Sequence, residues 1–311
     1  MKTNLKGDHL AIAELQDLHQ PDLLARKNIT GVGIGNKIRD GRDTGDPCLT
    51  VFVEQKLDKA ILSREEIIPS VLGKFKTDVI ESGVIFAGSN VSLTERIRPV
   101  KGGYSVGHYK ITAGTIATCV TDAAPTPGIP SMYYILSNNH VLANSNDAKI
   151  GDPILQPGSY DGGVNPGDIV AKLSRYVPIK FDGTDNYVDC AIAEGDLNIL
   201  NREIYWIGHV KGTAAAQIGM MVHKTGRTTG HTSGKITSIN ATVNVNYGGG
   251  HVGKFVDQII TTSMSAPGDS GSLVLEDSGE NAVGLLFAGS ASITILNNIS
   301  RVLKYLSIKF H

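Results

Sequence analysis

The segment APGDSGS at residues 266–272 is the most informative stretch of this 311-residue sequence. Ser270 stands in a run of small turn-forming residues, with Gly268 before it and Gly271 directly after it. Glycine adopts backbone dihedral angles that other residues avoid, and it leaves room for another chain to approach closely. A serine displayed in this way is typical of a nucleophile. The backbone N–H groups of Gly268 and Ser270 are then the candidate donors to a developing oxyanion, worth roughly 3–4 kcal/mol per donor.

A nucleophilic serine needs a base, and the base needs a group that orients it. The segment YYILSNNHVL at residues 133–142 offers His140, at the start of a turn or short helix that follows an apolar strand. The bland alternatives are an ordinary glycine-rich turn at Ser270 and a buried histidine satisfied by a backbone carbonyl at His140. Because the two segments occur together, we favour the catalytic interpretation.

The orienting group is predicted to be Asp189, in the segment YVDCAIA at residues 187–193. We expect this carboxylate to lie inside an otherwise apolar strand, where a buried charge needs a partner. An imidazole N–H meets that need. The alternatives are that Asp189 caps a turn at the end of a strand, or that Asp185 takes the place of the orienting group.

The chain order His140, Asp189, Ser270 is that of chymotrypsin and differs from subtilisin and the α/β-hydrolases. The segments SNNHV, DCAI and APGDSGS resemble the histidine, aspartate and serine segments of HtrA-type peptidases, a resemblance that covers about residues 100–305. The segments VHKTGRTTG (222–230) and GVGIG (31–35) are similar to bacterial trypsin-like proteins related to the plant narrow-leaf serine peptidases, which also carry a domain ahead of the barrels.

The resemblance implies a chymotrypsin-like double β-barrel and a serine endopeptidase that forms an acyl-enzyme on Ser270. A catalytically silent trypsin-fold binding or scaffold module remains an alternative, as does an esterase-like hydrolase that uses the same site. Two positions depart from the trypsin pattern. Ser272 replaces the usual second glycine after the nucleophile. Met264 stands where trypsin-like specificity needs an aspartate, so a pocket with Met264 at its base and Gly289 on its wall favours apolar or small side chains.

The fold is predicted to be mainly β, with a small α+β domain over residues 1–97 ahead of a peptidase domain over residues 98–311. In the first domain we expect a helix over residues 8–20, with Asp8 as its N-cap and Pro21 at its end. Leu15 and Leu18 share one face of this helix. The other expected elements of this domain are strands at 28–38, 49–54 and 77–81 and a helical stretch at 61–72.

From residue 102 to about 295 the sequence consists of short apolar runs separated by turn residues, which is typical of β-barrels. The segment YGGG at 247–250 is one of these turns. A helix over residues 298–306 is expected to pack on the barrels. The predicted strands are 133–136, 188–193, 234–239, 255–262, 272–275 and 283–287.

Composition narrows the possible partners and cofactors. The net charge of -1, from 29 basic and 30 acidic residues, gives no electrostatic reason to expect nucleic acid or an anionic membrane as partner. Three cysteines without a CxxC pair argue against a disulfide framework or a zinc site. We find no signal-peptide pattern and expect a cytoplasmic protein without metal or cofactor. The expected partners are a protein or peptide substrate and, through the N-terminal domain, a second copy or a regulatory protein.

Other motifs are assigned no chemistry. Gly31, Gly33 and Gly35 have the spacing GxGxG rather than the GxGxxG of a dinucleotide site, so we interpret them as strand glycines. Lys224 and Arg227 lack a P-loop pattern and are predicted to lie in a solvated hairpin. The nearby histidines His223 and His231 are expected to be structural or to line the substrate cleft.

Overall fold

The computed structural model describes residues 5–39, 42–57, 59–60, 62–83, 85, 91–111, 113–124, 132–277 and 280–310. The chain divides into two compact units, residues 1–90 and 91–311, where the sequence predicted a boundary between residues 97 and 98. Each unit has its own hydrophobic core and is described by itself.

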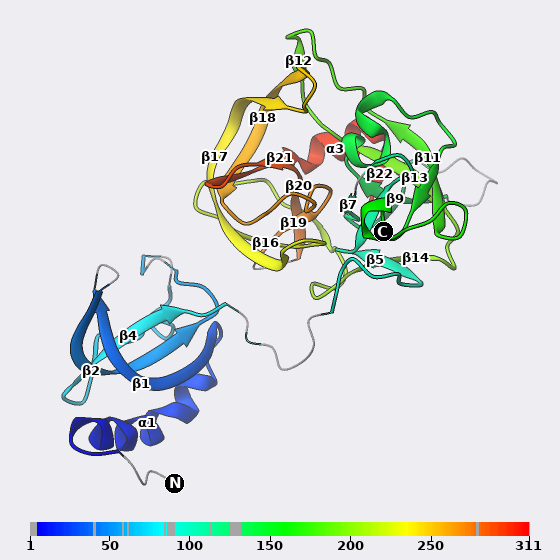
Figure 1. Ribbon diagram of the computed structural model, residues 1–311. Helices are drawn as coiled ribbons and strands as arrows, with labels where there is room; N and C mark the ends of the chain where they lie inside the picture. The colour runs from blue at the N-terminus through cyan, green and yellow to red at the C-terminus, as the bar shows by residue number, and fades with distance from the viewer. Residues whose placement is uncertain are drawn as a thin grey trace. The chain divides into compact units, whose positions relative to one another are not determined.

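The first unit is a four-stranded sheet with one helix on one of its faces (Figure 1). The strand order is β1-β2-β4-β3, in which β2 pairs antiparallel with β1 and parallel with β4. Side chains alternate along a strand, so Leu49, Val51 and Val53 of β2 share a face, and they pack with Ile12 and Leu23 of the helix. The elements are α1 (Asp8–Leu24), β1 (Ile29–Arg39), β2 (Arg42–Val53), β3 (Val71–Leu72) and β4 (Phe75–Glu81).

Helix α1 differs from its prediction at both ends. Gly7 is the N-cap and Asp8 is the first helical residue, without a side-chain cap. Pro21 lies inside the helix, which continues to Leu24 because Leu23 is buried in the core and holds the last turn against the sheet. Leu18, expected on the buried face, is 71% exposed.

The helix expected over residues 61–72 is absent from the described part of that segment. One turn forms there, in which the Ser63 carbonyl accepts from the N–H groups of Glu66 and Ile67. Two β-branched residues and Pro69 follow, and both disfavour continuation of a helix. The chain then enters the short hairpin of β3 and β4.

The second unit begins with an eight-stranded curved sheet of order β22-β8-β9-β13-β11-β10-β6-β7. Helix α2 (Asn139–Leu142) and a 3-10 helix, Asn144–Asn146, lie between β9 and β10, and a second 3-10 helix, Ser159–Asp161, lies between β10 and β11. A separate parallel pair joins β5 (Val100–Gly102) and β14 (Leu200–Ile204). The strands of the sheet are β6 (Ser105–His108), β7 (Gly114–Thr115), β8 (Cys119–Asp122), β9 (Tyr133–Ser137), β10 (Pro153–Leu155), β11 (Ile169–Tyr176), β13 (Ala191–Gly195) and β22 (Ile308–Lys309).

The second sheet of this unit closes into a barrel. Its order is β12-β18-β17-β16-β19-β20-β15, and β21 pairs with both β18 and β20, so six strands form a ring. Strands β17 and β18 make a long hairpin whose tip is the predicted YGGG turn (Figure 1). The strands are β12 (Asp185–Asn186), β15 (Gly212–Thr213), β16 (Met221–Gly226), β17 (Gly230–Asn246), β18 (Val252–Thr262), β19 (Leu273–Glu276), β20 (Asn281–Gly289) and β21 (Ile293–Asn298).

The two sheets and the C-terminal helix share one apolar cluster. Leu136 from the first sheet, Leu285 from the second and Val302 from helix α3 (Ile299–Leu306) all belong to it. Asn298 caps α3 by accepting a hydrogen bond from Ser300 N, and α3 matches the helix predicted over residues 298–306. This shared core holds the two barrels together and sets the relative positions of the loops between them. No helix in the described ranges is both long and apolar enough to cross a membrane.

Candidate active site

The three predicted triad residues come from three different segments of the second unit. His140 lies in α2, directly after strand β9 of the first sheet. Ser270 lies between β18 and β19 of the second sheet. Asp189 was expected inside a strand, but β13 begins only at Ala191, and Asp189 lies in the extended segment before it. Its neighbours Val188 and Cys190 are buried in the shared core, which explains the apolar pattern of this segment.

His140 and Asp189 contact each other through two hydrogen bonds. His140 Nδ1 lies 2.6 Å from Asp189 Oδ2, and the backbone N–H of His140 donates to Asp189 Oδ1 at 3.2 Å. The Asp189 side chain is fully buried, whereas that of His140 is 23% exposed. Asp185, the alternative partner, forms a half-exposed ion pair with Lys254 instead. Since Nδ1 faces the carboxylate, Nε2 is the imidazole nitrogen left for chemistry.

Further polar groups hold Asp189 in place. Tyr247 Oη donates to Asp189 Oδ2 at 2.8 Å. The backbone N–H of Asp189 donates to Asn297 Oδ1 at 2.9 Å, and its carbonyl accepts from Asn138 Nδ2 at 2.7 Å. Sequence reasoning assigned none of the three residues to the site: Tyr247 was interpreted as part of a turn, Asn138 was quoted only as part of the histidine segment, and Asn297 lies outside the predicted elements.

The Ser270 hydroxyl is directed toward the second sheet. Its Oγ donates to the Phe287 carbonyl at 3.5 Å, a long contact. Among the described residues, no hydrogen bond joins Ser270 Oγ to His140. The Ser270 backbone is anchored to the first sheet, because its carbonyl accepts from Thr115 N at 2.7 Å.

A buried ion pair supports the serine loop. Lys224 Nζ lies 3.2 Å from Asp269 Oδ2, and both side chains are fully buried. The solvated hairpin predicted for Lys224 is therefore wrong: Lys224 points into the barrel, where it is the cation that the buried Asp269 requires. Asp269 also accepts hydrogen bonds from Thr229 Oγ1 at 2.6 Å and from the backbone N–H groups of Thr228 and Ala266 at 2.9 Å each.

The pKa values of this pair shift in the directions that burial and pairing impose. Burial lowers the pKa of Lys224, against the attraction of Asp269. For Asp269, burial by itself raises the pKa, but the charge of Lys224 and the hydrogen bonds outweigh burial and leave the pKa below its ordinary value. Pairing and hydrogen bonding thus offset, for the Asp269 carboxylate, the cost of burying its charge.

Two side chains orient the peptide groups whose N–H belongs to Gly268 and Ser270. Thr228 Oγ1 donates to the Pro267 carbonyl at 2.9 Å, and Ser272 Oγ donates to the Asp269 carbonyl at 2.7 Å. In a trans peptide group the C=O and N–H point in opposite directions. The N–H groups of Gly268 and Ser270 therefore point away from these hydroxyls. Within the described residues, neither N–H donates to a protein acceptor.

Gly268 is required by its surroundings. Its φ is +101°, and a Cβ atom there would overlap the Arg227 guanidinium and Thr228 Oγ1. Arg227 is mostly buried rather than solvated as predicted, and it pairs with Asp161. A cavity of about 490 Å³ lies beside this loop; its lining residues are Thr94, Ala113, Tyr160, Arg227, Thr228, Pro267 and Gly268.

The predicted substrate-pocket residues, Met264 and Gly289, lie on two segments outside the APGDSGS loop. Met264 is 4% exposed and packs in the core of the closed barrel, close to Gly234. Gly289 is at the exposed end of β20, where a Cβ atom would lie 3.4 Å from Ser265 Oγ.

Comparisons with known proteins address the two units separately. The family described as the NARROW LEAF 1 N-terminal domain matches residues 15–80. Serine protease 2 of Streptomyces fradiae is 42% identical over 84 residues, which make up 27% of this chain and 44% of that protein. The chain thus spans less than half the length of this relative.

Among solved structures, a Nocardiopsis protease has a TM-score of 0.50 at 20% identity, and the match covers 68% of this chain and 98% of that one. For Thermobifida fusca Protease A the TM-score is 0.49 at 19% identity, with coverage of 68% and 97%. The double barrel has the chymotrypsin-like serine protease fold. The predicted fold class, including the α+β region ahead of the barrels and the C-terminal helix, is confirmed.

Two histidines form a pair on the β16–β17 hairpin of this fold. His223 Nδ1 lies 3.0 Å from His231 Nε2, and His223 Nε2 is buried without a hydrogen-bond partner. Burial lowers the pKa of both residues, and that of His231 falls to about 4, because His223 and Lys224 add to the effect of burial. No cluster of three or more potential metal ligands occurs among the described residues.

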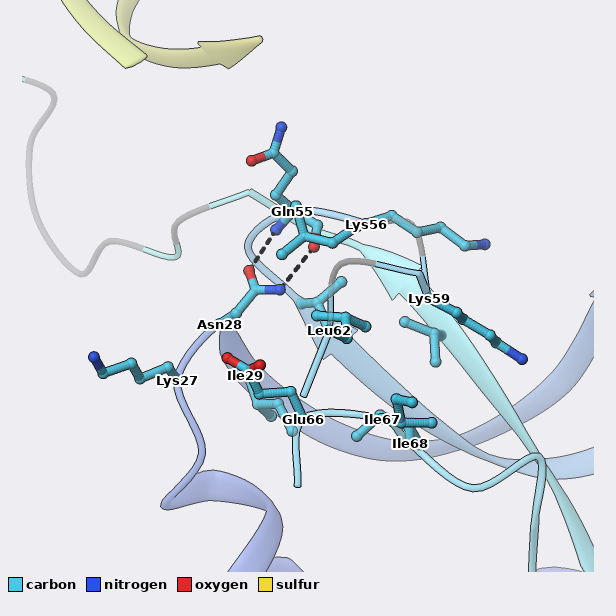
Figure 2. Close-up of a pocket in the computed structure, with 13 residues that line it drawn as sticks. Lys27, Asn28, Ile29, Gln55, Lys56, Lys59, Leu62, Glu66, Ile67 and Ile68 are labelled. Carbon is cyan, nitrogen blue, oxygen red and sulfur yellow. Dashed lines mark hydrogen bonds between the residues drawn. The ribbon is translucent and has the colours of Figure 1, made fainter. Parts of the chain in front are cut away.

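The first unit has a cavity of its own, of about 110 Å³ (Figure 2). Leu62, Ile67 and Ile68 contribute to its apolar lining. The polar groups at its edge are engaged with each other: Asn28 Nδ2 donates to the Gln55 carbonyl at 2.8 Å, and Gln55 N donates to Asn28 Oδ1 at 2.9 Å. Figure 2 shows the lysine side chains at the rim extending away from the apolar residues. This cavity therefore lacks convergent polar groups.

Proposed function

We propose that residues 91–311 form a serine endopeptidase that hydrolyses peptide bonds through an acyl-enzyme on Ser270. Ser270 Oγ attacks the substrate carbonyl carbon while His140 Nε2 takes the hydroxyl proton. His140 then gives that proton to the leaving amine as the C–N bond breaks, and a water molecule hydrolyses the ester by the same steps. Asp189 holds the imidazole in the tautomer that leaves Nε2 free to accept.

The observation that carries this proposal is the His140–Asp189 pair. A fully buried carboxylate 2.6 Å from Nδ1 stabilises the imidazolium that forms during attack. The backbone N–H of His140 donates to the other carboxylate oxygen, so the ring and its partner are held at two points. A histidine with a merely structural role needs neither a fully buried carboxylate as partner nor a partly exposed ring.

The serine loop supports the same proposal. Within the described residues, the N–H groups of Gly268 and Ser270 have no protein acceptor, and the hydrogen bonds of Thr228 and Ser272 to the neighbouring carbonyls direct these N–H groups away from the loop's own hydroxyls. We assign them to the substrate oxyanion.

One observation favours the second candidate, a catalytically silent module. Ser270 Oγ contacts the Phe287 carbonyl and, within the described residues, makes no hydrogen bond to His140, so the two side chains must approach each other before attack. Catalytic hydrogen bonds are often long in ligand-free enzymes and tighten when substrate binds. We therefore assign the observed rotamer to the resting enzyme.

The substrate is proposed to be an extended protein or peptide segment. The 490 Å³ cavity beside Gly268 adjoins the proposed oxyanion donors and offers room for residues on one side of the scissile bond. On the other side, Met264 and Gly289 are proposed to define a primary pocket for an apolar or small side chain. The name of the similar protein, Serine protease 2, supports a peptide rather than an ester as substrate.

For the whole chain we propose a relationship to the narrow-leaf serine peptidases, supported by the family match over residues 15–80. The first unit is proposed to mediate assembly or regulation. A cytoplasmic location is supported by three buried cysteines, Cys48, Cys119 and Cys190, none of which is in a disulfide.

Digestion of a denatured protein library by wild type and by Ser270→Ala, with identification of the products by mass spectrometry, tests the function. The proposal predicts internal cleavages by wild type alone, enriched after apolar or small residues. Hydrolysis of activated esters without any peptide cleavage would favour the esterase. No turnover of either substrate by folded wild type would favour the silent module.

A further inference from the structure

Tyr247 approaches the triad from the tip of the β17–β18 hairpin. Its hydroxyl donates to Asp189 Oδ2 at 2.8 Å, the same oxygen that lies 2.6 Å from His140 Nδ1. Residue 247 is 58 positions away from residue 189 in the chain, so the contact is made by the fold and not by local sequence.

The Tyr247 side chain is held in this position by its own turn and by aromatic contacts. Tyr247 N donates to the His251 carbonyl at 2.9 Å, and His251 N donates to the Gly248 carbonyl at 2.9 Å, which closes the turn. The ring lies edge-on to His140, with 5.9 Å between centroids, and edge-on to Phe181, at 5.6 Å. Aromatic pairs at such distances are attractive.

We propose that Tyr247 is a positioning residue of the triad, whose hydroxyl locks the Asp189 carboxylate and moderates the basicity of His140. This inference rests on the proposed peptidase function. With Tyr247, the buried carboxylate accepts three hydrogen bonds: from His140 N at Oδ1, and from His140 Nδ1 and Tyr247 Oη at Oδ2. Each donor restricts rotation of the carboxylate, and each spreads its negative charge.

The charge of the carboxylate determines how strongly it holds the imidazolium. A donor to Asp189 stabilises the carboxylate and weakens its attraction for a protonated His140, so the imidazolium is held less strongly than at the same site without the donor. Tyr247 is a lasting donor, because burial and the nearby Asp189 charge raise its own pKa well above the ordinary value. Its hydroxyl therefore keeps its proton at neutral pH.

Other ionisable groups around the tyrosine are engaged elsewhere. On β18, Lys254 pairs with Asp185 at 2.8 Å, and beyond the turn His251 packs against Phe181 at 4.9 Å between ring centroids. Among the described residues, Asp189 is the acceptor that the Tyr247 hydroxyl reaches. The effect of removing this hydroxyl should thus appear at His140.

The test is Tyr247→Phe, which keeps the ring and removes the hydroxyl. Tyr305→Phe is the matched control, because Tyr305 is 46% exposed, stacks on Tyr187 and, among the described residues, makes no hydrogen bond to a triad residue. For Tyr247→Phe we expect kcat to fall about tenfold with KM unchanged, and the acidic limb of the kcat/KM profile to move to higher pH by roughly half a unit to one unit. Tyr305→Phe should match wild type.

NMR titration of the His140 ring gives a readout that does not need turnover. The expected result is a higher His140 pKa in Tyr247→Phe than in wild type. Incorporation of a fluorinated tyrosine at 247, which is a stronger donor, should shift the His140 pKa in the opposite direction, and it keeps the proposal testable if the phenylalanine variant does not fold. A shifted His140 titration in a protein without peptidase activity would support the role of Tyr247 and reject the proposed peptidase function. An unchanged titration and an unchanged pH profile would overturn the role of Tyr247.

Discussion

At the residue scale, the proposed role of Asp189 depends on its burial and its hydrogen bonds. It is fully buried, and its carboxylate accepts from His140 and Tyr247. Removing charge from a buried, hydrogen-bonded position changes which protons its neighbours carry, while the shape of the site is preserved. An isosteric amide at this position therefore separates the charge from the packing.

For Asp189→Asn we predict a fall in kcat of roughly 10⁴-fold with little change in KM, because an amide stabilises neither the required tautomer nor the imidazolium. Steady-state kinetics on a peptide substrate measure the effect. Asp185→Asn is the control, since Asp185 pairs with Lys254 at the surface, and it should retain wild-type kcat. Equal effects of the two substitutions would reject Asp189 as the orienting residue.

The buried Lys224–Asp269 pair should matter for stability more than any surface pair. Lys224→Met leaves Asp269 as an uncompensated buried charge, which costs about 3–5 kcal/mol. Lys211→Met breaks an exposed ion pair with Glu280 and should change the free energy of unfolding by no more than about 1 kcal/mol. Denaturant titrations of both variants compare the two directly. Similar losses in both would show that the Asp269 carboxylate is satisfied without its lysine.

Sequence reasoning found the residues that stand in distinctive local motifs. It missed the residues whose partners are distant in the sequence and are brought close only by the fold. Ser270 and His140 stand in recognisable segments, and Asp189 was found because a charge interrupts an apolar run. Tyr247 and Lys224 carry no such signal, because their partners lie 58 and 45 positions away in the chain. For Lys224, a basic residue near glycine and threonine was interpreted as solvated, although a buried Asp269 required a cation.

At the scale of elements, the β16–β17 hairpin combines a buried lysine with two touching histidines. Its strands pair from Met221–Lys235 to Gly226–Gly230, which places His223, Lys224 and His231 within one short ladder. Protonating either imidazole adds positive charge beside the one that Lys224 already carries. The hairpin should therefore be sensitive to acid.

His231 predicts the direction of this pH dependence. Its pKa is lowered to about 4 in the folded protein, mainly by burial, whereas an unfolded histidine titrates near 6.5. The unfolded chain thus binds the proton first, and stability falls as the pH drops from about 6.5 to about 4, by roughly 3 kcal/mol in total. Denaturant titrations across this range should show that His231→Gln lacks this part of the loss.

His209→Gln is the control for that experiment, because His209 is exposed. It should lose stability in parallel with wild type. If His231→Gln also followed the wild-type curve, the histidine pair would not be the source of the acid sensitivity.

Elements were predicted well where hydrophobic periodicity dominates and poorly where tertiary contacts override local preference. The C-terminal helix and strands β9, β18, β19 and β20 lie close to their predicted positions, whereas β17 runs from Gly230 to Asn246 although only 234–239 was predicted. Helix α1 continues through Pro21 because Leu23 reaches the core, and the helix expected over 61–72 is replaced by a turn and a short hairpin. The start of β13 was misplaced because buried residues flank Asp189 outside the strand as well as inside it.

On the scale of the whole molecule, each unit has a core of its own. The first unit packs α1 against its sheet, and the second has separate clusters in each barrel and between them. A protein made of residues 91–311 alone should therefore fold, and its kcat should stay within about twofold of the full chain. Circular dichroism, kinetics and light scattering check this together.

The same truncation tests the role proposed for the first unit. If that unit mediates assembly, the full chain should be larger in solution than one copy and the truncated protein monomeric. An unchanged state of assembly and unchanged regulation after truncation would remove that role.

The central claim is that Ser270 is a nucleophile activated by His140 and Asp189. Labelling with a fluorophosphonate, followed by intact-mass and peptide mass spectrometry, measures this directly. The account predicts one adduct per chain on Ser270 in wild type, none in Ser270→Ala, and much slower labelling in Asp189→Asn. Folded wild type that remains unlabelled, or an adduct that persists in Ser270→Ala, would contradict it.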